Sequence, residues 1–417
     1  MRILFIAPYV PSLIRVRPYQ WIKSLTALGH AVTVVALGMD GTERDEEART
    51  ALLGVCEAVH VVAHSKPQAA LQCALALPTP TPLWAAYCHS PALERVLRRL
   101  LRTQAFDVAH VEHLRAAHFA RVLKARLPLV FDAVDCLADL QQQMRRAPGR
   151  SLPARLVSWE EQLKLRRYEP RAAAWFHRTL ITSTHDADAL QSLARAVRVS
   201  PFISVVPNGV DLDYFQFPPG AVRTPRSVVF SGKMSYAANH DAALYFAREI
   251  WPHVRAACPD ATLTLAGSGP RADLRALGTS PAGGIHVTGH VPDLRPFLAR
   301  ASVAVCPLRI GVGIQNKALE AMAMGLPVVA TPLAARALPP DAPGRLLRTA
   351  QTPAQFAQAV VDLLGRPDDA RQMGQAARRY VETHHNWHIL AARVSAIYGD
   401  AIDAFSQTNS PSPGAKR

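Results

Sequence analysis

The chain has 417 residues, a length at which two folded domains are more usual than one. Apolar residues make up 49% and charged residues 19% of the sequence, which is typical of globular proteins and excludes a wholly disordered chain. The net charge of +15 points to an anionic partner: a phosphorylated substrate, an anionic lipid surface or a nucleic acid. Residues 91–178 concentrate this excess, with 17 Lys or Arg against 9 Asp or Glu. Because no nucleic-acid-binding module is recognisable, nucleic acid is the least favoured partner.

Cysteine spacing and hydropathy indicate where in the cell the protein is found and whether it holds a metal. The six cysteines are scattered without a CxxC pair, which predicts reduced structural thiols and no metal centre. The first apolar run ends at Pro8 and is too short for a signal peptide, and no stretch of about 18 apolar residues exists. We therefore expect a cytoplasmic protein, with a peripheral position on the inner face of the cell membrane as an open alternative.

The N-terminal half begins with a strand, a loop, a helix and a second strand. Residues 2–7 and 31–37 are apolar runs, and a helix over 19–28 ends at Gly29. This order predicts a βαβ unit of a parallel sheet. The loop after the first strand opens at the carboxyl edge of that sheet, where ligands of such folds bind. Arg15 and Arg17 lie in this loop and are candidates for contact with an acceptor phosphate.

The next 170 or so residues continue the series with a basic insertion. Prolines at 78, 80 and 82 make residues 66–89 too broken for a regular element, and a basic amphipathic helix over 92–102 follows. Further strands are predicted at 108–112, 129–132, 179–183 and 203–210. Arginines alternate with Leu and Trp residues over 141–171, which indicates either a solvated charged face or a surface that docks on an anionic membrane.

A proline-rich linker over 217–226 precedes a second series of strands and helices. Strands are predicted at 227–232, 261–266, 285–288, 301–306 and 328–331, and helices at 241–258, 353–364 and 369–382, with a last helix from Asn386. We therefore predict an N-terminal Rossmann-like domain, residues 1–216 joined by the helix 386–406, and a C-terminal one, residues 217–385. Residues 407–417 are expected to be a disordered tail.

The stretch 308–331 is a glycine loop, a helix and a buried strand. Gly311 and Gly313 let the backbone approach a ligand closely, and Lys317 and Glu320 fall in the first turns of the helix. N–H groups at a helix start attract anions, so the pattern predicts a phosphate-and-sugar site. An ordinary loop–helix–strand unit is the alternative at this point.

Four motifs together carry a family resemblance: Val206–Phe215, Val229–Met234, Leu265–Pro270 and the stretch 308–331. With them the sequence resembles family 4 of the retaining, nucleotide-sugar-dependent glycosyltransferases. The resemblance implies the GT-B fold, an α/β fold of two facing Rossmann-like domains with a cleft between them. A closer resemblance is to sugar transferases associated with exopolysaccharide and exosortase gene clusters.

The resemblance implies roles for particular residues. Lys233, Lys317 and Glu320 are expected to be catalytic, the lysines on the donor diphosphate and Glu320 on the donor ribose. The acceptor side is expected to include Arg15, Arg17, His113 and Asp135, although a hydrogen-bonded loop histidine is the alternative for His113. The remaining donor-binding residues are expected to be Gly232, Asn239, Gly267, Arg309, Gly311, Val312, Gly313, Ile314, Gln315 and Asn316.

The sequence departs from the family pattern at three positions. Val312 stands where the family has the first of two glutamates, and Asn239 stands where it has a second cation for the diphosphate. Lys317 or Arg309 is expected to supply that charge. Val134 stands before Asp135, where many relatives have a histidine.

The implied activity is transfer of a sugar, with retention, from a nucleoside-diphosphate sugar to a hydroxyl of a polysaccharide or lipid-linked glycan, such as a polyprenyl-linked acceptor. No cofactor and no metal are expected, and the nucleotide sugar is a substrate. A nucleotide-sugar epimerase of the same shape and an inactive nucleotide-sugar-binding subunit are the alternatives.

Overall fold

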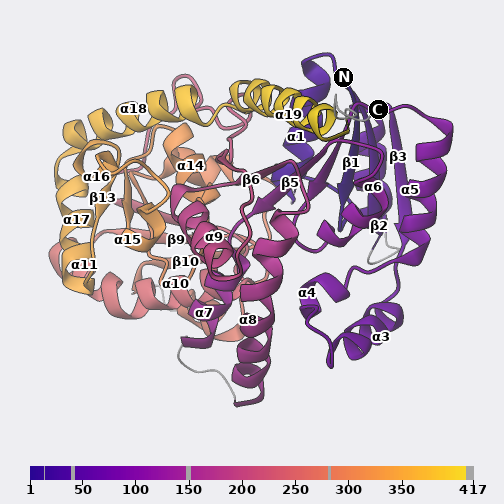
Figure 1. Cartoon of the computed structure of the whole chain (residues 1–417). Coiled ribbons are helices and arrows are strands. Elements are labelled where there is room, and N and C mark those ends of the chain that lie inside the picture. The colour runs from indigo at the N-terminus through magenta and orange to yellow at the C-terminus, as the bar shows by residue number, and fades with distance from the viewer. Residues whose placement is uncertain (14, 39–42, 147–151, 280–282, 410–417) are drawn as a thin grey trace, which may run out of the picture. The chain divides into compact units, whose positions relative to one another are not determined.

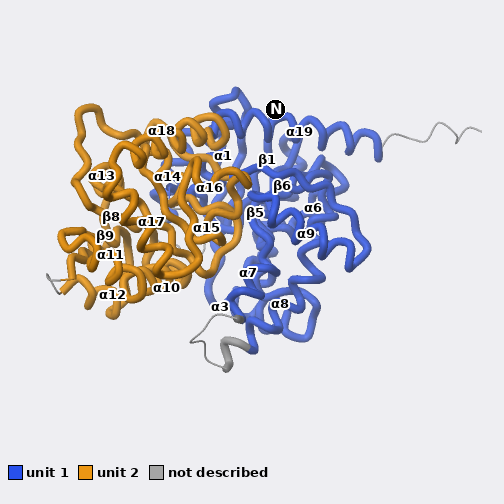
Figure 2. Tube along the Cα trace, turned by 90° about the vertical axis from the view of Figure 1, so that its left-hand side faces the viewer, with its two compact units in different colours: residues 1–207, 387–417 blue, residues 208–386 orange. Residues whose placement is uncertain are grey.

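The computed structural model describes residues 1–13, 15–38, 43–146, 152–279 and 283–409. The chain divides into two compact units: unit 1, residues 1–207 with 387–417, and unit 2, residues 208–386 (Figure 2). The divisions fall at 207/208 and 386/387, whereas the sequence placed them at 216/217 and 385/386. Residues 208–216 group with unit 2 because the Val210 N–H donates to the His385 carbonyl (2.7 Å).

Unit 1 is built on a parallel sheet. Its strands in the described residues are β1 (Arg2–Ala7), β2 (Ala31–Gly38), β3 (Ala58–Ala63), β4 (Val108–Glu112), β5 (Leu129–Val134), β6 (Arg178–Ile181) and β7 (Ile203–Val205). Their order in the sheet is β3-β2-β1-β4-β5-β6-β7. Residues 3–7 of β1 are fully buried, as expected for a parallel strand covered on both faces.

Unit 1 also contains helices (Figure 1). They are α1 (Val16–Ala27), α2 (Glu43–Leu53), α3 (Lys66–Ala76), α4 (Leu83–Ala86), α5 (Pro91–Thr103), α6 (Ala120–Leu123), α7 (Leu137–Arg146), α8 (Leu152–Ala173), α9 (Thr184–Ala196) and α19 (Trp387–Asn409). The expectation of no regular element over 66–89 was wrong. Ser65 and Gln68 form a reciprocal capping box that starts α3, and the prolines follow its end or precede α4.

The last helix, α19, packs on unit 1. Trp387 meets Trp21 of α1 edge-on, with ring centroids 4.8 Å apart, and the buried Tyr398 reaches β4 through His110. The helix runs to Asn409, three residues beyond its predicted end at 406, while residues 410–417 of the expected tail lie outside the described residues. Among the described residues, no helix has the length and apolar character needed to cross a bilayer.

Unit 2 contains a second parallel sheet, in the order β10-β9-β8-β11-β12-β13. The described strands are β8 (Ser227–Ser231), β9 (Thr262–Ala266), β10 (Ile285–Gly289), β11 (Val303–Cys306), β12 (Val328–Ala330) and β13 (Arg348–Thr349). Its helices are α10 (Ala237–Tyr245), α11 (Trp251–Ala257), α12 (Ala272–Leu277), α13 (Arg295–Arg300), α14 (Asn316–Ala323), α15 (Pro332–Ala335), α16 (Ala342–Arg345), α17 (Pro353–Gly365) and α18 (Pro367–His384).

One predicted helix of unit 2 is more complex than expected. The helix predicted over 241–258 is α10 and α11 joined by a π-helical turn, Phe246–Ile250, immediately before Trp251-Pro252. The predicted fold class, two Rossmann-like parallel-sheet domains, is confirmed.

Candidate functional site

Two glycines end neighbouring strands at the carboxyl edge of the sheet in unit 2. Gly232 follows β8 and Gly267 follows β9, with φ of 145° and 146°. A Cβ added at Gly267 would lie 1.9 Å from the Gly232 carbonyl oxygen, so no larger residue fits there without moving backbone. The two turns are held together, because the Met234 N–H donates to the Ser268 carbonyl (2.8 Å). The edge therefore presents bare backbone, which allows close approach of a ligand.

Helix α14 starts beside this edge. Gln315 is its N-cap residue, and its side-chain amide donates to the Val312 carbonyl (3.2 Å), which closes the glycine loop. The Asn208 side chain donates to Oδ1 of Asn316 (2.8 Å), so the Pro-Asn-Gly turn fixes the first residue of the helix. Sequence reasoning left Asn208 out of the site; its place in the Pro-Asn-Gly motif was the available signal.

Lys317 and Asn239 converge on Gly232. The position of a Cβ at Gly232 would be 2.9 Å from Asn239 Nδ2 and 3.4 Å from Lys317 Cε. Asn239 donates to the main-chain oxygen of Lys233 (3.0 Å), so its amide shapes the turn. Four residues that the sequence assigned to the donor side therefore meet at one strand end, although they come from three separate places in the chain: Gly232 with Lys233, Asn239 and Lys317.

The cations at this edge have no acidic partner. Among the described residues, no carboxylate lies within 4 Å of the side-chain nitrogen of Lys233 or Lys317, and the Lys317 ammonium donates to the Gln315 amide oxygen (3.4 Å). Lys233 is exposed. Lys233 on its glycine turn and Lys317 at the start of α14, neither of them in an ion pair within the described part of the chain, form a local positive potential suited to a phosphate group.

Glu320 is one turn further along α14 and is partly buried. Burial raises the pKa of its carboxyl, and the nearby Lys317 opposes that rise. Gly313, with φ of 63°, and Ile314 are buried, so this part of the loop offers main-chain groups rather than the Ile314 side chain. Val312 is partly buried, and the Gly311 carbonyl accepts from Arg336 (2.9 Å).

Arg309 is engaged elsewhere. Its guanidinium binds both carboxylate oxygens of Asp241 on α10, at 3.0 and 2.6 Å, and lies 4.5 Å from the ring centre of Tyr245. Asn239 stands where the family has a second cation for the diphosphate, and the sequence named Lys317 and Arg309 as possible replacements. Of these two, Lys317 is the one beside Gly232.

A buried ion pair dominates the matching region of unit 1. Arg17, on α1, donates to both oxygens of Asp132 at the end of β5, at 2.8 and 3.0 Å. The Trp21 indole N–H also binds Asp132 (2.9 Å), and Arg17 donates further to the Val206 and Pro207 carbonyls. The guanidinium of Arg17 is thus used within the fold, which disfavours the predicted contact with an acceptor phosphate. Its partner lies 115 positions away in sequence, so the first loop alone did not reveal it.

His110 and Glu112 complete this cluster. They are two residues apart on β4 and share its buried face with Asp132 on the next strand. Burial lowers the pKa of His110 to about 4 and, aided by Asp132, raises that of Glu112 well above its usual value. These three side chains lie close enough together to hold an ion. The Arg17 guanidinium on Asp132, however, would repel a cation, so the group fits a metal poorly.

The other predicted acceptor-side residues lie at the same carboxyl edge. His113 follows β4 with φ of 66°; its Nδ1 accepts from the Arg115 N–H (3.2 Å), and burial lowers its pKa to about 3. Asp135 follows β5 and accepts from the Thr182 hydroxyl (3.1 Å). Burial, followed by the charge of Asp186, raises the pKa of Asp135 to about 7. Arg15 donates to the Val10 carbonyl and lies over the Tyr9 ring.

Backbone conformation marks the residue before Asp135. Val134 has φ of 67°, a conformation that is costly for a β-branched side chain. Asp132 supports it, because its Oδ1 accepts from the Val134 N–H (3.2 Å). Two neighbouring strand ends, at His113 and Val134, therefore carry left-handed residues.

Two Rossmann-like units, each built on a parallel sheet, are the architecture of the GT-B class of glycosyltransferases. Residues 16–214 match the family described as Glycosyltransferase Family 4, and residues 225–366 match Glycosyl transferases group 1. The chain belongs to the family 4 glycosyltransferases of GT-B fold. This confirms the family resemblance seen in the sequence.

Individual relatives agree with this assignment. A phosphatidyl-myo-inositol mannosyltransferase of Mycolicibacterium smegmatis is 30% identical over 201 residues, 46% of this chain and 50% of that protein. An MMP alpha-(1->4)-mannosyltransferase of Mycolicibacterium hassiacum is 28% identical over 317 residues, 71% of each. The match thus spans half the length of the first relative. The Anabaena Alr3699/HepE structure in complex with UDP has a TM-score of 0.63 at 16% identity, covering 96% of this chain and 100% of that one, which is a likeness of fold.

Proposed function

We propose that the chain is a retaining, metal-independent glycosyltransferase that moves a sugar from a nucleoside-diphosphate sugar to a hydroxyl of a polysaccharide or lipid-linked glycan. The observation that carries the proposal is the approach of Lys317 to Gly232, beside Lys233 and the start of α14, with no carboxylate on either lysine among the described residues. Such a site suits the negative charge that develops on a leaving diphosphate.

The proposed donor contacts follow from this geometry. The diphosphate would lie on the Gly232 and Gly267 turns, with Lys317 and Lys233 as its cations and main-chain N–H groups near Gly313–Asn316 as further donors. A preorganised donor aimed at developing charge is typically worth about 3 kcal/mol in the transition state. Glu320 would hold the ribose hydroxyls, and Asn239 would shape the turn rather than bind phosphate, since its amide donates to Lys233.

Transfer would follow a front-face route. The oxygen of the leaving phosphate would take the proton of the acceptor hydroxyl, so that no carboxylate base is needed. This is consistent with Val312, which places an apolar side chain where the family pattern has a glutamate. Asp135, with its raised pKa, and His113 would lie on the acceptor side.

The names of the relatives suggest what to test first. Two of them are mannosyltransferases, and one name includes a phosphatidylinositol acceptor, so a mannosyl donor and a lipid acceptor are the first choices. The purified chain would be incubated with radiolabelled GDP-mannose or UDP-sugars and a polyprenyl-diphosphate glycan. Labelled lipid product supports the proposal. A changed sugar nucleotide without acceptor would instead indicate an epimerase, and nucleotide binding without turnover an inactive binding subunit.

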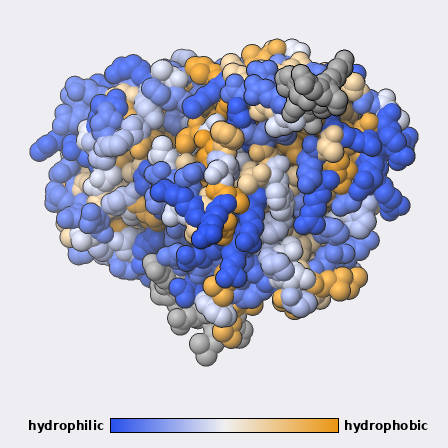
Figure 3. Space-filling view, viewed as in Figure 1, coloured by the Kyte–Doolittle hydropathy of each residue, from blue (hydrophilic) through white to orange (hydrophobic). Residues whose placement is uncertain are grey.

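We also propose a peripheral membrane partner for unit 1. Leu71 and Leu75 of α3 and Leu77, just after it, are 57–60% exposed, and Figure 3 shows hydrophobic surface over this helix, at the lower right. Lys164 of α8 donates to the Ala76 and Leu77 carbonyls, which brings Trp159 and Leu163 of α8, about half exposed, toward the same region. Exposed apolar residues flanked by Arg166 and Arg167 suit an anionic lipid surface.

Arg150, which belongs to the predicted basic segment 91–178, lies outside the described residues. Sedimentation with vesicles that contain anionic phospholipid tests the surface. Trp159→Glu should reduce binding, and Ile389→Glu, with 51% exposure against 50% for Trp159, is the matched control. Equal binding of both variants contradicts the membrane proposal.

A further inference from the structure

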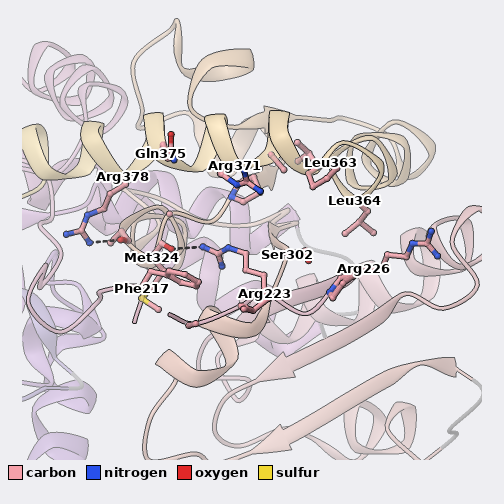
Figure 4. Close-up of a pocket in the computed structure, with 18 of the residues that line it drawn as sticks. Phe217, Arg223, Arg226, Ser302, Met324, Leu363, Leu364, Arg371, Gln375 and Arg378 are labelled. Atoms are coloured by element: carbon pink, nitrogen blue, oxygen red, sulfur yellow. Dashed lines mark hydrogen bonds between the residues drawn. The ribbon is translucent and has the colours of Figure 1, made fainter. Parts of the chain in front are cut away.

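Unit 2 has a large pocket at the edge of its sheet opposite the lysines. Arg226, Ser302 and Pro327 lie just before β8, β11 and β12, so the pocket is at the amino edge, whereas Gly232 and Gly267 are at the carboxyl edge. Its volume is about 1100 Å³, at the upper end of the sizes typical of pockets that bind organic molecules. In Figure 4, α18 with Arg371 and Arg378 lies on one side and Arg223 on the other.

The charged residues that line the pocket are all cationic. Its cationic residues are Arg223, Arg226, Arg371, Arg378 and Arg379. No Asp or Glu is among the lining residues. Three of the arginines have acidic partners outside the lining: Asp260 for Arg226, Asp368 for Arg371 and Glu382 for Arg378. The guanidinium fork suits phosphate oxygens, so the pocket favours an anion.

Arg223 is the innermost of these cations. Its guanidinium donates to the Leu298, Ala301 and Met324 carbonyls, at 3.3, 2.9 and 2.8 Å, and lies 4.4 Å from the ring centre of Phe217. No described carboxylate lies within 4 Å of it. Burial lowers the pKa of Arg223 to about 10, which means that its charge is held at a desolvation cost that an anion would offset.

Apolar groups form much of the remaining wall. They are Phe217, Ala221, Val222, Pro225, Ala323, Met324, Pro327, Leu363, Leu364 and Ala370. A free phosphate would leave most of this surface in water. The lining therefore suits a molecule with an apolar or aromatic group as well as an anionic one.

We propose that this pocket binds an organic phosphate ester, with the phosphate on the arginines of α18 and Arg223 and its apolar group against Phe217, Leu363 and Leu364. The ester could come from a lipid phosphate or from a soluble aryl or alkyl phosphate, since both present the same chemistry. The pocket is on the opposite edge of the sheet from the diphosphate turns, so it is a second site.

Helix α14 connects the two edges. Its end, at Ala323 and Met324, lines the pocket, where Arg378 and Arg223 donate to the last main-chain oxygens, at 2.5 and 2.8 Å. Its start carries Lys317. An ester that draws these guanidinium groups away from the helix end changes how α14 is held. By thermodynamic linkage, the ester and a nucleotide would then alter each other's affinity. This consequence rests on the proposed function, whereas binding of the ester does not.

The test is calorimetric titration of the full chain with octyl phosphate, phenyl phosphate, inorganic phosphate and octanol, below the micelle concentration. We expect either ester to bind at least tenfold more tightly than inorganic phosphate, since burial of two methylene groups suffices for that difference. Preference for the octyl ester indicates a lipid source, and preference for the phenyl ester a soluble one. Binding of octanol as tight as that of octyl phosphate overturns the proposal.

The matched variants are Arg371→Glu and Arg345→Glu. Both arginines are exposed helix residues of unit 2 in a local ion pair, with Asp368 and Asp341, but only Arg371 lines the pocket. Arg371→Glu should weaken ester binding about tenfold and Arg345→Glu should not. Arg223 is left intact because it also holds the end of α14. Equal binding by the two variants overturns the proposal, as does displacement of the ester by saturating nucleoside diphosphate in direct competition. If no nucleotide binds at all, the proposed donor site fails while the ester result stands.

Discussion

The carboxyl edges of the two sheets differ in whether their key cations are paired with carboxylates. In unit 2, Lys233 lies on a glycine turn and Lys317 at the start of α14, with no carboxylate within 4 Å of either side-chain nitrogen among the described residues. In unit 1, Arg17 and Asp132 are buried and bind each other through two hydrogen bonds. Both edges carry arginine or lysine at places where a ligand was predicted. Arg17 in unit 1 and Arg309 in unit 2 are paired with carboxylates, whereas Lys233 and Lys317 have none within 4 Å among the described residues.

The difference shows how to separate a binding cation from a structural one. A buried guanidinium whose charge is neutralised by a buried carboxylate has little charge left for a ligand, and its role is to hold elements together. A lysine that forms no ion pair, beside bare backbone, keeps its charge available for an anionic ligand. Arg309, although exposed, is paired with Asp241, whereas Lys317 forms no ion pair with a described residue, so the two cations that the sequence offered as equivalent differ.

The largest effect should come from Asp132→Asn in unit 1. The substitution leaves the buried Arg17 charge without its partner, so the free energy of unfolding should fall by about 3–5 kcal/mol. Chemical denaturation measures this. Asp341→Asn, which removes the partner of the exposed Arg345, should change stability little. A loss below 1 kcal/mol for Asp132→Asn would show that the pair is not structural.

Gly267→Ala should be the next most costly change. Its Cβ would meet the Gly232 carbonyl oxygen at 1.9 Å and its φ is 146°, so we expect a loss of about 3 kcal/mol and weakened nucleotide binding. Gly29→Ala is the control, with φ of 83° but nothing within 4 Å of the added Cβ, and should cost less. Equal thermal denaturation of the two variants would contradict the close approach.

Asp135 should make stability depend on pH. Its pKa is raised from 3.8 to about 7 by burial and by Asp186, so between these values the folded chain holds a proton that the unfolded chain releases. Stability then falls as pH rises through this window, by about 1.4 kcal/mol per unit at most. In Asp135→Asn, the difference in unfolding free energy between pH 4.5 and 6.5 should shrink by about 2 kcal/mol. An unchanged profile would argue against a neutral, buried Asp135.

The smallest expected change in free energy concerns catalysis and tests the donor site most specifically. Lys317→Ala should lower kcat/KM at least tenfold, about 1.4 kcal/mol, through loss of a cation on the leaving phosphate. Arg309→Ala removes a cation from the same loop that is already paired with Asp241, and should change kcat/KM less. Initial-rate kinetics with varied donor separate the two. A greater loss for Arg309→Ala would reverse the assignment.

Local patterns in the sequence predicted much of this structure. Apolar runs indicated both parallel sheets, and the family motifs indicated Gly232 and Gly267 as donor-side residues. The pairing of Arg309 with Asp241 joins residues 68 positions apart, and the His110–Glu112–Asp132 cluster depends on the register of two strands. Such contacts are set by tertiary packing, so the motifs alone did not show which cations stay without acidic partners.

Crystallography with a bound nucleoside diphosphate tests the central claim most directly. We predict that the diphosphate lies on the Gly232 and Gly267 turns, with an oxygen within hydrogen-bonding distance of the Lys317 ammonium and near the N–H groups at the start of α14. A diphosphate found at the amino edge, among the arginines of the pocket, or at Arg17 in unit 1 would contradict the account.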